Sequence, residues 1–191
     1  MGMYAYLANS WKNRFENAEL QRNRMVGWRN EPPTIRIPKP TRLDRARELG
    51  YRAKPGIIVV RQRILRGGRQ RPDIKGARRS KHARQRKILS MNYQQVAERR
   101  AAKKFPNMEV LSSYLLAKDG THYWYEIIMA DKSHPVIVSD RQLSWISEKQ
   151  HTRRAFRGLT SAAKKSRGLY NKGKGAEKLR PSQRAHGRKA K

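Results

Sequence analysis

The apolar residues of the first thirty positions recur at helical spacing. One stripe with i, i+3, i+4 and i+7 spacing predicts an amphipathic helix near the N-terminus, formed by Tyr4, Leu7, Ala8 and Trp11. A second, weaker helical segment spans about 17–29, because the Pro32–Pro33 pair must end it. The alternation at 34–37 then indicates a short strand.

A short helix is expected over 41–49. Thr41 suits its N-cap, Asp44 its third position and Gly50 its C-terminal stop. The periodicity turns three apolar side chains inward, those of Leu43, Ala46 and Leu49. The basic residues of this segment would then project away from the core.

The strongest strand signal lies at 57–65. Its first four residues are apolar on both faces, which favours a central position in a sheet. Arg61 and Arg63 share one face of the second half, so we expect that side to lie against something negative.

Residues 90–147 carry the clearest pattern of a folded body. A helix is expected between Asn92 and Pro106, where Asn92 and Gln95 resemble a capping box. Its apolar face comprises Tyr93, Val96, Ala97, Ala101 and Phe105. Residues 135–138 predict a short strand or turn, and 140–146 a short helix.

Two strands, 108–118 and 121–130, are expected to form a hairpin around a two-residue turn at Asp119–Gly120. The pairs across this hairpin are then Lys118 with Thr121 and Tyr114 with Tyr125. Both faces are largely apolar, so we expect other elements to cover the hairpin on both sides. Its aromatic side chains could stack on bases, but at this spacing we expect them in the core.

Two basic segments interrupt and follow this body. Between positions 61 and 87 there are 12 Lys or Arg and one acid, and residues 149–191 hold 15 Lys or Arg and one acid. Neither segment has enough apolar surface to offset the entropy of ordering alone. The sequence therefore predicts an α+β body at 1–148 with a β-hairpin packed by helices. A basic loop at about 66–90 and a basic extension at 149–191 complete this arrangement.

Composition narrows the possible functions. Lys and Arg number 46 and Asp and Glu 14, which gives a formal net charge of +32. Such a charge favours a bound polyanion, and nucleic acid is the obvious one. The chain has no cysteine and no stretch of 18 apolar residues, and it begins without a signal-peptide pattern. We therefore expect a soluble, intracellular protein without disulfides or thiolate metal sites.

No catalytic motif is present. There is no GxSxG, HExxH or Walker loop, and no two of the five histidines have metal-ligand spacing. We expect no enzyme activity, no cofactor and no bound metal. Three alternatives remain beside an RNA-binding structural protein. They are a DNA-compacting chromosomal protein, a nuclease using a hairpin acid such as Glu126, and a cationic membrane-surface protein, which the lack of an amphipathic basic helix disfavours.

Several stretches in colinear order resemble one family, ribosomal protein fifteen of the large subunit in its archaeal and eukaryotic class. They are PTRLDRARELGYRAKPG at 40–56, VVRQRILRGGRQRP at 59–72, RRAAKKFPNMEVLSSYLLAKDGTHYWYEIIMAD at 99–131, HPVI at 134–137, RRAFRGLTSAAKKSRGL at 153–169 and RPSQRAHGRKAK at 180–191. The resemblance implies a constitutive, non-catalytic component of the cytoplasmic large subunit. Its partners would be large-subunit rRNA and neighbouring ribosomal proteins, with no membrane contact and no homo-oligomer.

Three groups of basic residues are the candidate rRNA contacts. In the loop they are Arg61, Arg63, Arg66, Arg69, Arg71, Arg78, Arg79, Lys81, Arg84 and Arg86, where arginine suits bidentate phosphate binding. In the extension, mainly on the resemblance, they are Arg153, Arg154, Arg157, Lys164, Lys165, Arg167, Arg184 and Arg188. Around 41–52 they are Arg42, Arg45 and Arg52, although Asp44 with Arg47, or Glu48 with Arg52, could instead form surface ion pairs.

Overall fold

A four-stranded antiparallel sheet forms the centre of the protein. The computed structural model describes residues 2–13, 17–68, 76, 90–176 and 179. The strands are β1 (Thr34–Ile37), β2 (Ile57–Leu65), β3 (Met108–Lys118) and β4 (His122–Asp131). Their order is β1-β2-β4-β3, so β2 is central as its apolar pattern predicts. The expected α+β fold class is confirmed.

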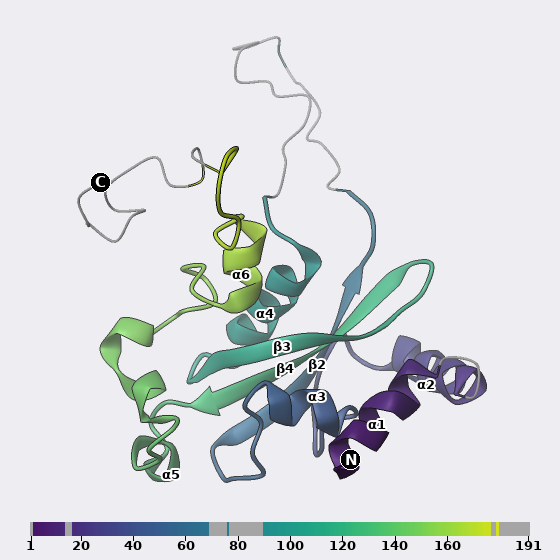
Figure 1. The fold of residues 1–191 in the computed structure, drawn as a ribbon, viewed down its shortest axis with the longest axis horizontal. Helices are drawn as coiled ribbons and strands as arrows, with labels where there is room; N and C mark the ends of the chain where they lie inside the picture. Colours follow the sequence, from purple (N-terminus) through teal and green to yellow (C-terminus); the bar gives the residue numbers. More distant parts are fainter. Residues whose placement is uncertain (1, 14–16, 69–75, 77–89, 177–178, 180–191) are drawn as a thin grey trace.

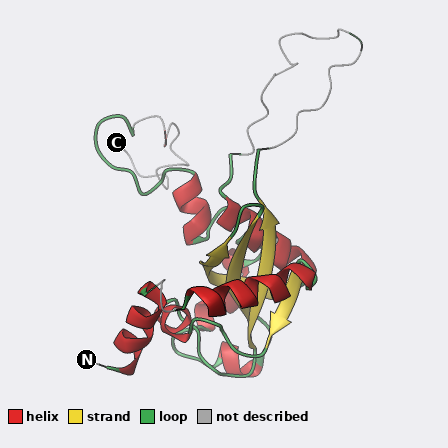
Figure 2. Ribbon diagram, turned by 90° about the vertical axis from the view of Figure 1, so that its right-hand side faces the viewer, coloured by secondary structure: helices red, strands yellow, loops and turns green. Residues whose placement is uncertain are grey.

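Helices cover both faces of the sheet. One face carries α4 (Tyr93–Lys104) with α6 (Ser161–Ser166) beside it, and the other carries α1 (Met3–Lys12), α2 (Ala18–Asn30) and α3 (Leu43–Glu48) (Figures 1 and 2). At one end of the sheet lie α5 (Pro135–Val138) and two 3-10 turns, Ser144–Ser147 and Lys149–His151. The N-terminal helices and the strand at 34–37 agree with their predictions.

The core on the α4 side is built by close packing of small and branched side chains. Val60, Ile127 and Met129 of the sheet are fully buried and pack in one cluster with Ala97 and Ala101 of α4. Alanine lets the helix backbone approach the sheet closely, which gives the dense packing typical of a protein interior. The C-terminal segment joins this core through the buried side chain of its Ala155.

The core on the opposite face is richer in aromatic side chains. Trp124 of β4 is 1% exposed and its ring centroid lies 6.0 Å from that of Trp28 in α2. Val59, Ile128 and Ala46 are buried in the same cluster. The hairpin is therefore covered on both sides, and the expectation that its aromatic residues belong to the core holds for Trp124 as for Tyr114 and Tyr125.

The predicted register of the hairpin is wrong. Lys118 pairs with Tyr123 rather than Thr121, and Tyr114 pairs with Glu126 rather than Tyr125. The carboxylate of Asp119 accepts hydrogen bonds from the backbone N–H groups of Thr121 and His122, which widens the turn beyond two residues. Register shifts between Val110 and Ser112 and between Leu115 and Ala117 add two bulges.

Local capping is partly as expected. The backbone N–H of Gln95 donates to Asn92 Oδ1 at 2.8 Å, but the N–H of Asn92 donates to Ser166 of α6, so the capping box is not reciprocal. The helix expected from Thr41 begins at Leu43. Gly50 does end it, with a φ of +97° that favours glycine. Residues 135–138, expected as a strand or turn, form the single helical turn α5.

Candidate nucleic-acid interface

The candidate contacts divide into three structural states. Some are fixed inside the body and some point outward from it. Others lie outside the described residues, and these are Arg69, Arg71, Arg78, Arg79, Lys81, Arg84, Arg86, Arg184 and Arg188. For the described candidates, the structure shows which protein groups each side chain contacts.

Arg61 and Arg63 are committed to internal contacts. The Arg61 guanidinium lies 2.5 Å from the Glu31 carboxylate and 4.7 Å from the ring centroid of Trp28, with only 10% of its side chain exposed. Arg63 donates to the backbone carbonyls of Arg29 and Trp28. The negative partner expected beside Arg61 is thus a carboxylate of the same chain.

Arg154 is also built into the body. Its Nη1 donates to the carbonyl oxygen of Val110 at 2.7 Å, and its guanidinium lies 4.8 Å from the ring centroid of Trp145. Burial lowers the pKa of Arg154, while the nearby carboxylates of Glu98 and Glu109 oppose that shift. A guanidinium held in this way fixes the C-terminal segment against β3.

The cations around α3 form ion pairs other than those considered from the sequence. Arg42 Nη2 lies 2.8 Å from Asp44 Oδ2, and Arg45 pairs with Glu48. Arg52 donates to the backbone carbonyl of Tyr51 at 3.0 Å. Neither the Asp44–Arg47 nor the Glu48–Arg52 pair forms, because a closer arginine occupies each carboxylate.

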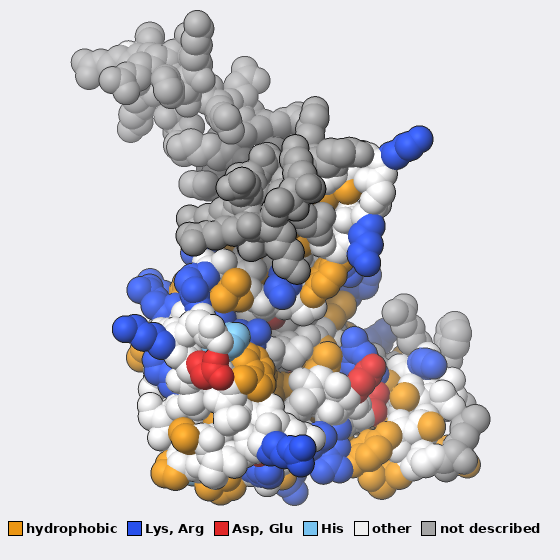
Figure 3. Space-filling model, turned by 60° about the vertical axis from the view of Figure 1, so that its left-hand side comes forward, with side chains coloured by type: hydrophobic (Ala, Val, Ile, Leu, Met, Phe, Trp, Pro, Cys, Tyr) orange, Lys and Arg blue, Asp and Glu red, His pale blue; other side chains and the backbone are white. Residues whose placement is uncertain are grey.

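A set of cations points outward from α4, from α6 and from the residues that flank α6. Arg100, Lys164 and Lys165 are exposed, and no acid among the described residues pairs with them. Within the described residues, Arg157 and Arg167 donate to backbone carbonyls of their own segment. Lys and Arg side chains are spread over the face shown in Figure 3, and acidic side chains form small patches among them.

A recess of about 1090 Å³ lies between the end of β2, the start of α4 and α6. Arg66, Arg100 and Lys165 contribute to its lining together with apolar residues. At its edge the Tyr93 hydroxyl accepts from the N–H of Gly67 and donates to the Gly67 carbonyl, each at 2.9 Å. These two bonds fix the chain where the basic loop begins.

Two buried glutamates hold the basic C-terminal segment on the sheet. Glu109, 4% exposed, accepts from the backbone N–H groups of Arg153 and Arg154 at 2.6 and 3.3 Å. Glu98, 1% exposed, accepts from the hydroxyls of Ser113 and Thr160 at 2.5 and 2.6 Å. Burial raises the pKa of Glu98 although both hydroxyl bonds act against the shift.

A third buried glutamate, Glu126, makes a similar attachment on the opposite face. It is 0% exposed and accepts from the backbone N–H of Thr41 at 3.1 Å and from the Tyr114 hydroxyl. Burial raises its pKa. The described residues contain no group of three potential metal ligands, and Glu126 has no access to a substrate.

Sequence reasoning missed these three attachments. Glu109 and Glu126 stand inside strongly apolar strands, and an acid in such a position is the available signal. The same contacts bear on the expected boundary at 148/149, because Ala155, Thr160 and Ala163 are all 0% exposed. The boundary stays a prediction, and this packing favours a later one, after Ser166.

No helix in the described ranges is long and apolar enough to cross a membrane. The fold and its outward cations define a class: a small α+β body with exposed Lys and Arg side chains on its described surface. The family described as Ribosomal L15 matches residues 2–186. The chain is also 51% identical to the large ribosomal subunit protein eL15 of Methanocella arvoryzae, over 98% of this chain and 97% of that protein. The chain belongs to this family of large-subunit ribosomal proteins, which confirms the expected structural, non-enzymatic class.

Proposed function

We propose that this protein binds folded rRNA within the cytoplasmic large ribosomal subunit and supports assembly of the subunit. The observation that carries the proposal is the set of outward cations on α4 and α6 that have no acidic partner among the described residues, beside the recess where the basic loop begins. Phosphate groups crowded between rRNA helices would supply the negative partners of these cations. Neighbouring ribosomal proteins are the other expected partners.

The proposed contacts exclude the internal arginines. The guanidinium groups of Arg61 and Arg154 are already bound to Glu31 and to the Val110 carbonyl, so we assign them to the stability of the body and not to phosphate binding. Among the described residues the proposed contacts are Arg66, Arg100, Arg153, Arg157, Lys164, Lys165 and Arg167. The loop at 69–89 and the end of the chain remain proposed contacts on charge alone.

Salt dependence tests this proposal. Replacing Arg100, Lys164 and Lys165 together with Gln should flatten the plot of log binding constant against log salt by about 0.7–0.9 per lost phosphate contact. The control replaces Lys132, Arg141 and Lys149, three cations at the α5 end of the sheet, and removes the same charge. Equal slopes for the two triple variants would refute localised contact. Equal affinity for rRNA and random duplex DNA would favour the chromosomal alternative.

A further inference from the structure

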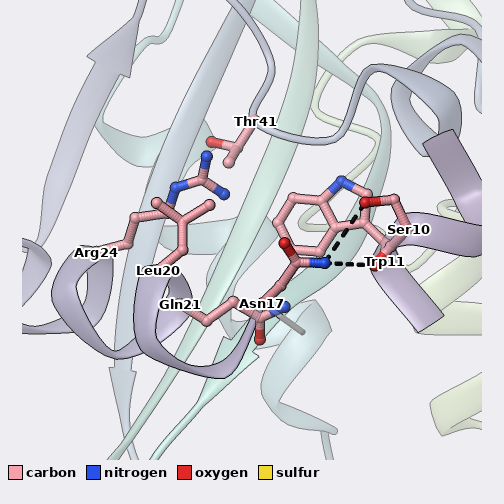
Figure 4. Close-up of a pocket in the computed structure, with 7 residues that line it drawn as sticks. All are labelled: Ser10, Trp11, Asn17, Leu20, Gln21, Arg24 and Thr41. Carbon is pink, nitrogen blue, oxygen red and sulfur yellow. Dashed lines mark hydrogen bonds between the residues drawn. The ribbon is translucent and has the colours of Figure 1, made fainter. Parts of the chain in front are cut away.

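A small cleft separates α1 from α2 on the face opposite α4. Trp11 lies on one side of it, and Leu20, Gln21 and Arg24 of α2 lie on the other, with Thr41 at one end (Figure 4). Its volume is about 140 Å³. A cavity of about 150 Å³ accommodates benzene, whereas drug-sized ligands need about 300 Å³ or more. The cleft therefore fits one flat ring.

Some polar groups of this cleft have no partner among the described residues. Among the described residues, no hydrogen bond to the Gln21 amide and no acid beside Arg24 is found. The Asn17 amide nitrogen donates to the Ser10 carbonyl at 2.9 Å, which leaves its carbonyl oxygen facing no described donor. Amide donors and acceptors beside an aromatic ring are the groups that read the edge of a base.

Charge selects the occupant. Arg24 lines the cleft, and the two helices beside it are basic, because α1 and α2 carry several Lys and Arg residues and, in their described residues, a single acid, Glu19. A flat ring attached to a negative backbone matches this environment better than an aromatic side chain of another protein, which brings no charge of its own.

We propose that the cleft binds one unpaired nucleobase of large-subunit rRNA, an inference that rests on the proposed function. The base stacks on the Trp11 indole, and Asn17 and Gln21 bond its edge. The Arg24 guanidinium now lies 5.7 Å from the centroid of the Trp11 ring. Two stacking steps of about 3.4 Å need about 7 Å, so a small movement of the Arg24 side chain lets it cover the other face of the base.

Paired variants of the full chain test this cleft. Gln21→Ala and Arg24→Gln alter the lining, whereas Asn23→Ala removes another side-chain amide and Arg22→Gln another positive charge at exposed positions of α2 outside the cleft. Binding to deproteinised large-subunit rRNA is measured at one salt concentration, and base-specific chemical probing locates protected nucleotides. Each cleft variant should bind about tenfold more weakly and lose protection at the same unpaired base. The controls should keep that protection.

The aromatic wall is tested separately, because Trp11 also packs against the core of this face. Trp11→Leu should lose the same protected base, and Trp11→Phe should recover part of it while both variants unfold at similar denaturant concentrations. Normal rRNA binding with unchanged protection in Gln21→Ala and Arg24→Gln would overturn the cleft proposal alone. A crosslink from the cleft to a ribosomal protein in assembled subunits would also overturn it. Failure of the unmodified protein to bind rRNA would overturn the proposed function itself.

Discussion

The two faces of the sheet are covered in different ways. On one face α4 contributes five buried residues, including Ala97 and Ala101 at 0% exposed. On the other face α1 and α2 contribute none, and their contact with the sheet depends on half-buried Trp11 and Trp28 with guanidinium groups over their rings. The α4 side is a self-contained core, whereas the α1–α2 side is a thinner cover whose polar groups face outward. The proposed base-binding cleft lies within this thinner cover.

Buried glutamate carboxylates hold other segments of the chain in place by accepting their hydrogen bonds. Glu98 attaches the C-terminal segment on the α4 side, Glu109 attaches it at the edge strand β3, and Glu126 attaches the chain before α3 on the face opposite α4. With 14 acids against 46 basic residues, these internal positions keep carboxylates away from the surface. The arrangement lets the body fold while its outer charge remains strongly positive.

The largest effect is expected from truncating the chain within the α4 side. Ending it after Gln150 removes both backbone donors to Glu109 and the Thr160 hydroxyl from Glu98. Because unsatisfied buried groups each cost about 1–3 kcal/mol, the free energy of unfolding should fall by more than about 3 kcal/mol. Denaturant titration measures this loss.

The matched truncation ends the chain after Tyr170 and retains those bonds. It should keep the unfolding midpoint of the full chain while weakening incorporation into subunits. The sequence predicted a body that ends at 148, and such a body would fold without 149–191. Equal stability of the two truncated proteins would support that earlier prediction and contradict the structural contribution of 152–166.

A smaller effect is expected on the α1–α2 side. Arg61→Gln leaves Glu31 without its ion pair and Trp28 without its stacked guanidinium. Removing one partner of a fully buried pair costs about 3–5 kcal/mol, and the Glu31 side chain is 31% exposed, so we expect about 1–2 kcal/mol. Arg36→Gln, at an exposed position of β1, should change the unfolding free energy by less than about 0.5 kcal/mol. A larger loss of unfolding free energy for Arg36→Gln than for Arg61→Gln would contradict the distinction between internal and outward arginines.

Local patterns predicted most elements of the fold because each depends on neighbours in the sequence. The apolar runs at 57–65 and 108–118 gave their strands, and Asn92 and Gly50 gave a helix start and a helix end. Two bulges in β3 depend on contacts across the sheet, and no local pattern marks them. The hairpin register was therefore the least predictable feature of the fold.

The candidate contacts were predictable as a class but not one by one. Lys164 and Arg61 look alike as basic residues, yet one is exposed and the other is paired with a carboxylate thirty residues away. Thr41 was assigned to a helix cap, but Glu126, eighty-five residues away, takes its backbone N–H. Charge composition is thus visible in sequence, whereas the partner of each charge is set by the tertiary fold.

The smallest expected effect is a pH dependence of stability that comes from Glu98 on the α4 side. Burial raises the pKa of Glu98 above its ordinary 4.5, so the folded protein binds the proton more readily than the unfolded chain does. Stability from this group is fully present below pH 4.5 and is lost as pH rises through the raised pKa. Glu98→Gln stays neutral, so its stability relative to the unmodified protein should increase between pH 4.5 and 7.

Asp140→Asn provides the opposite sign in the same experiment. The hydrogen bond from Lys54 and the backbone N–H of Gln142 lower the pKa of Asp140, so its contribution is present above its ordinary 3.8 and is lost only as pH falls further. Between pH 4.5 and 7 the stability difference for Asp140→Asn should therefore stay constant. Denaturant midpoints at both pH values measure the two differences. A constant difference for Glu98→Gln would mean that the carboxylate is charged in the folded state throughout. The bonds from Ser113 and Thr160 would then outweigh burial on the α4 side.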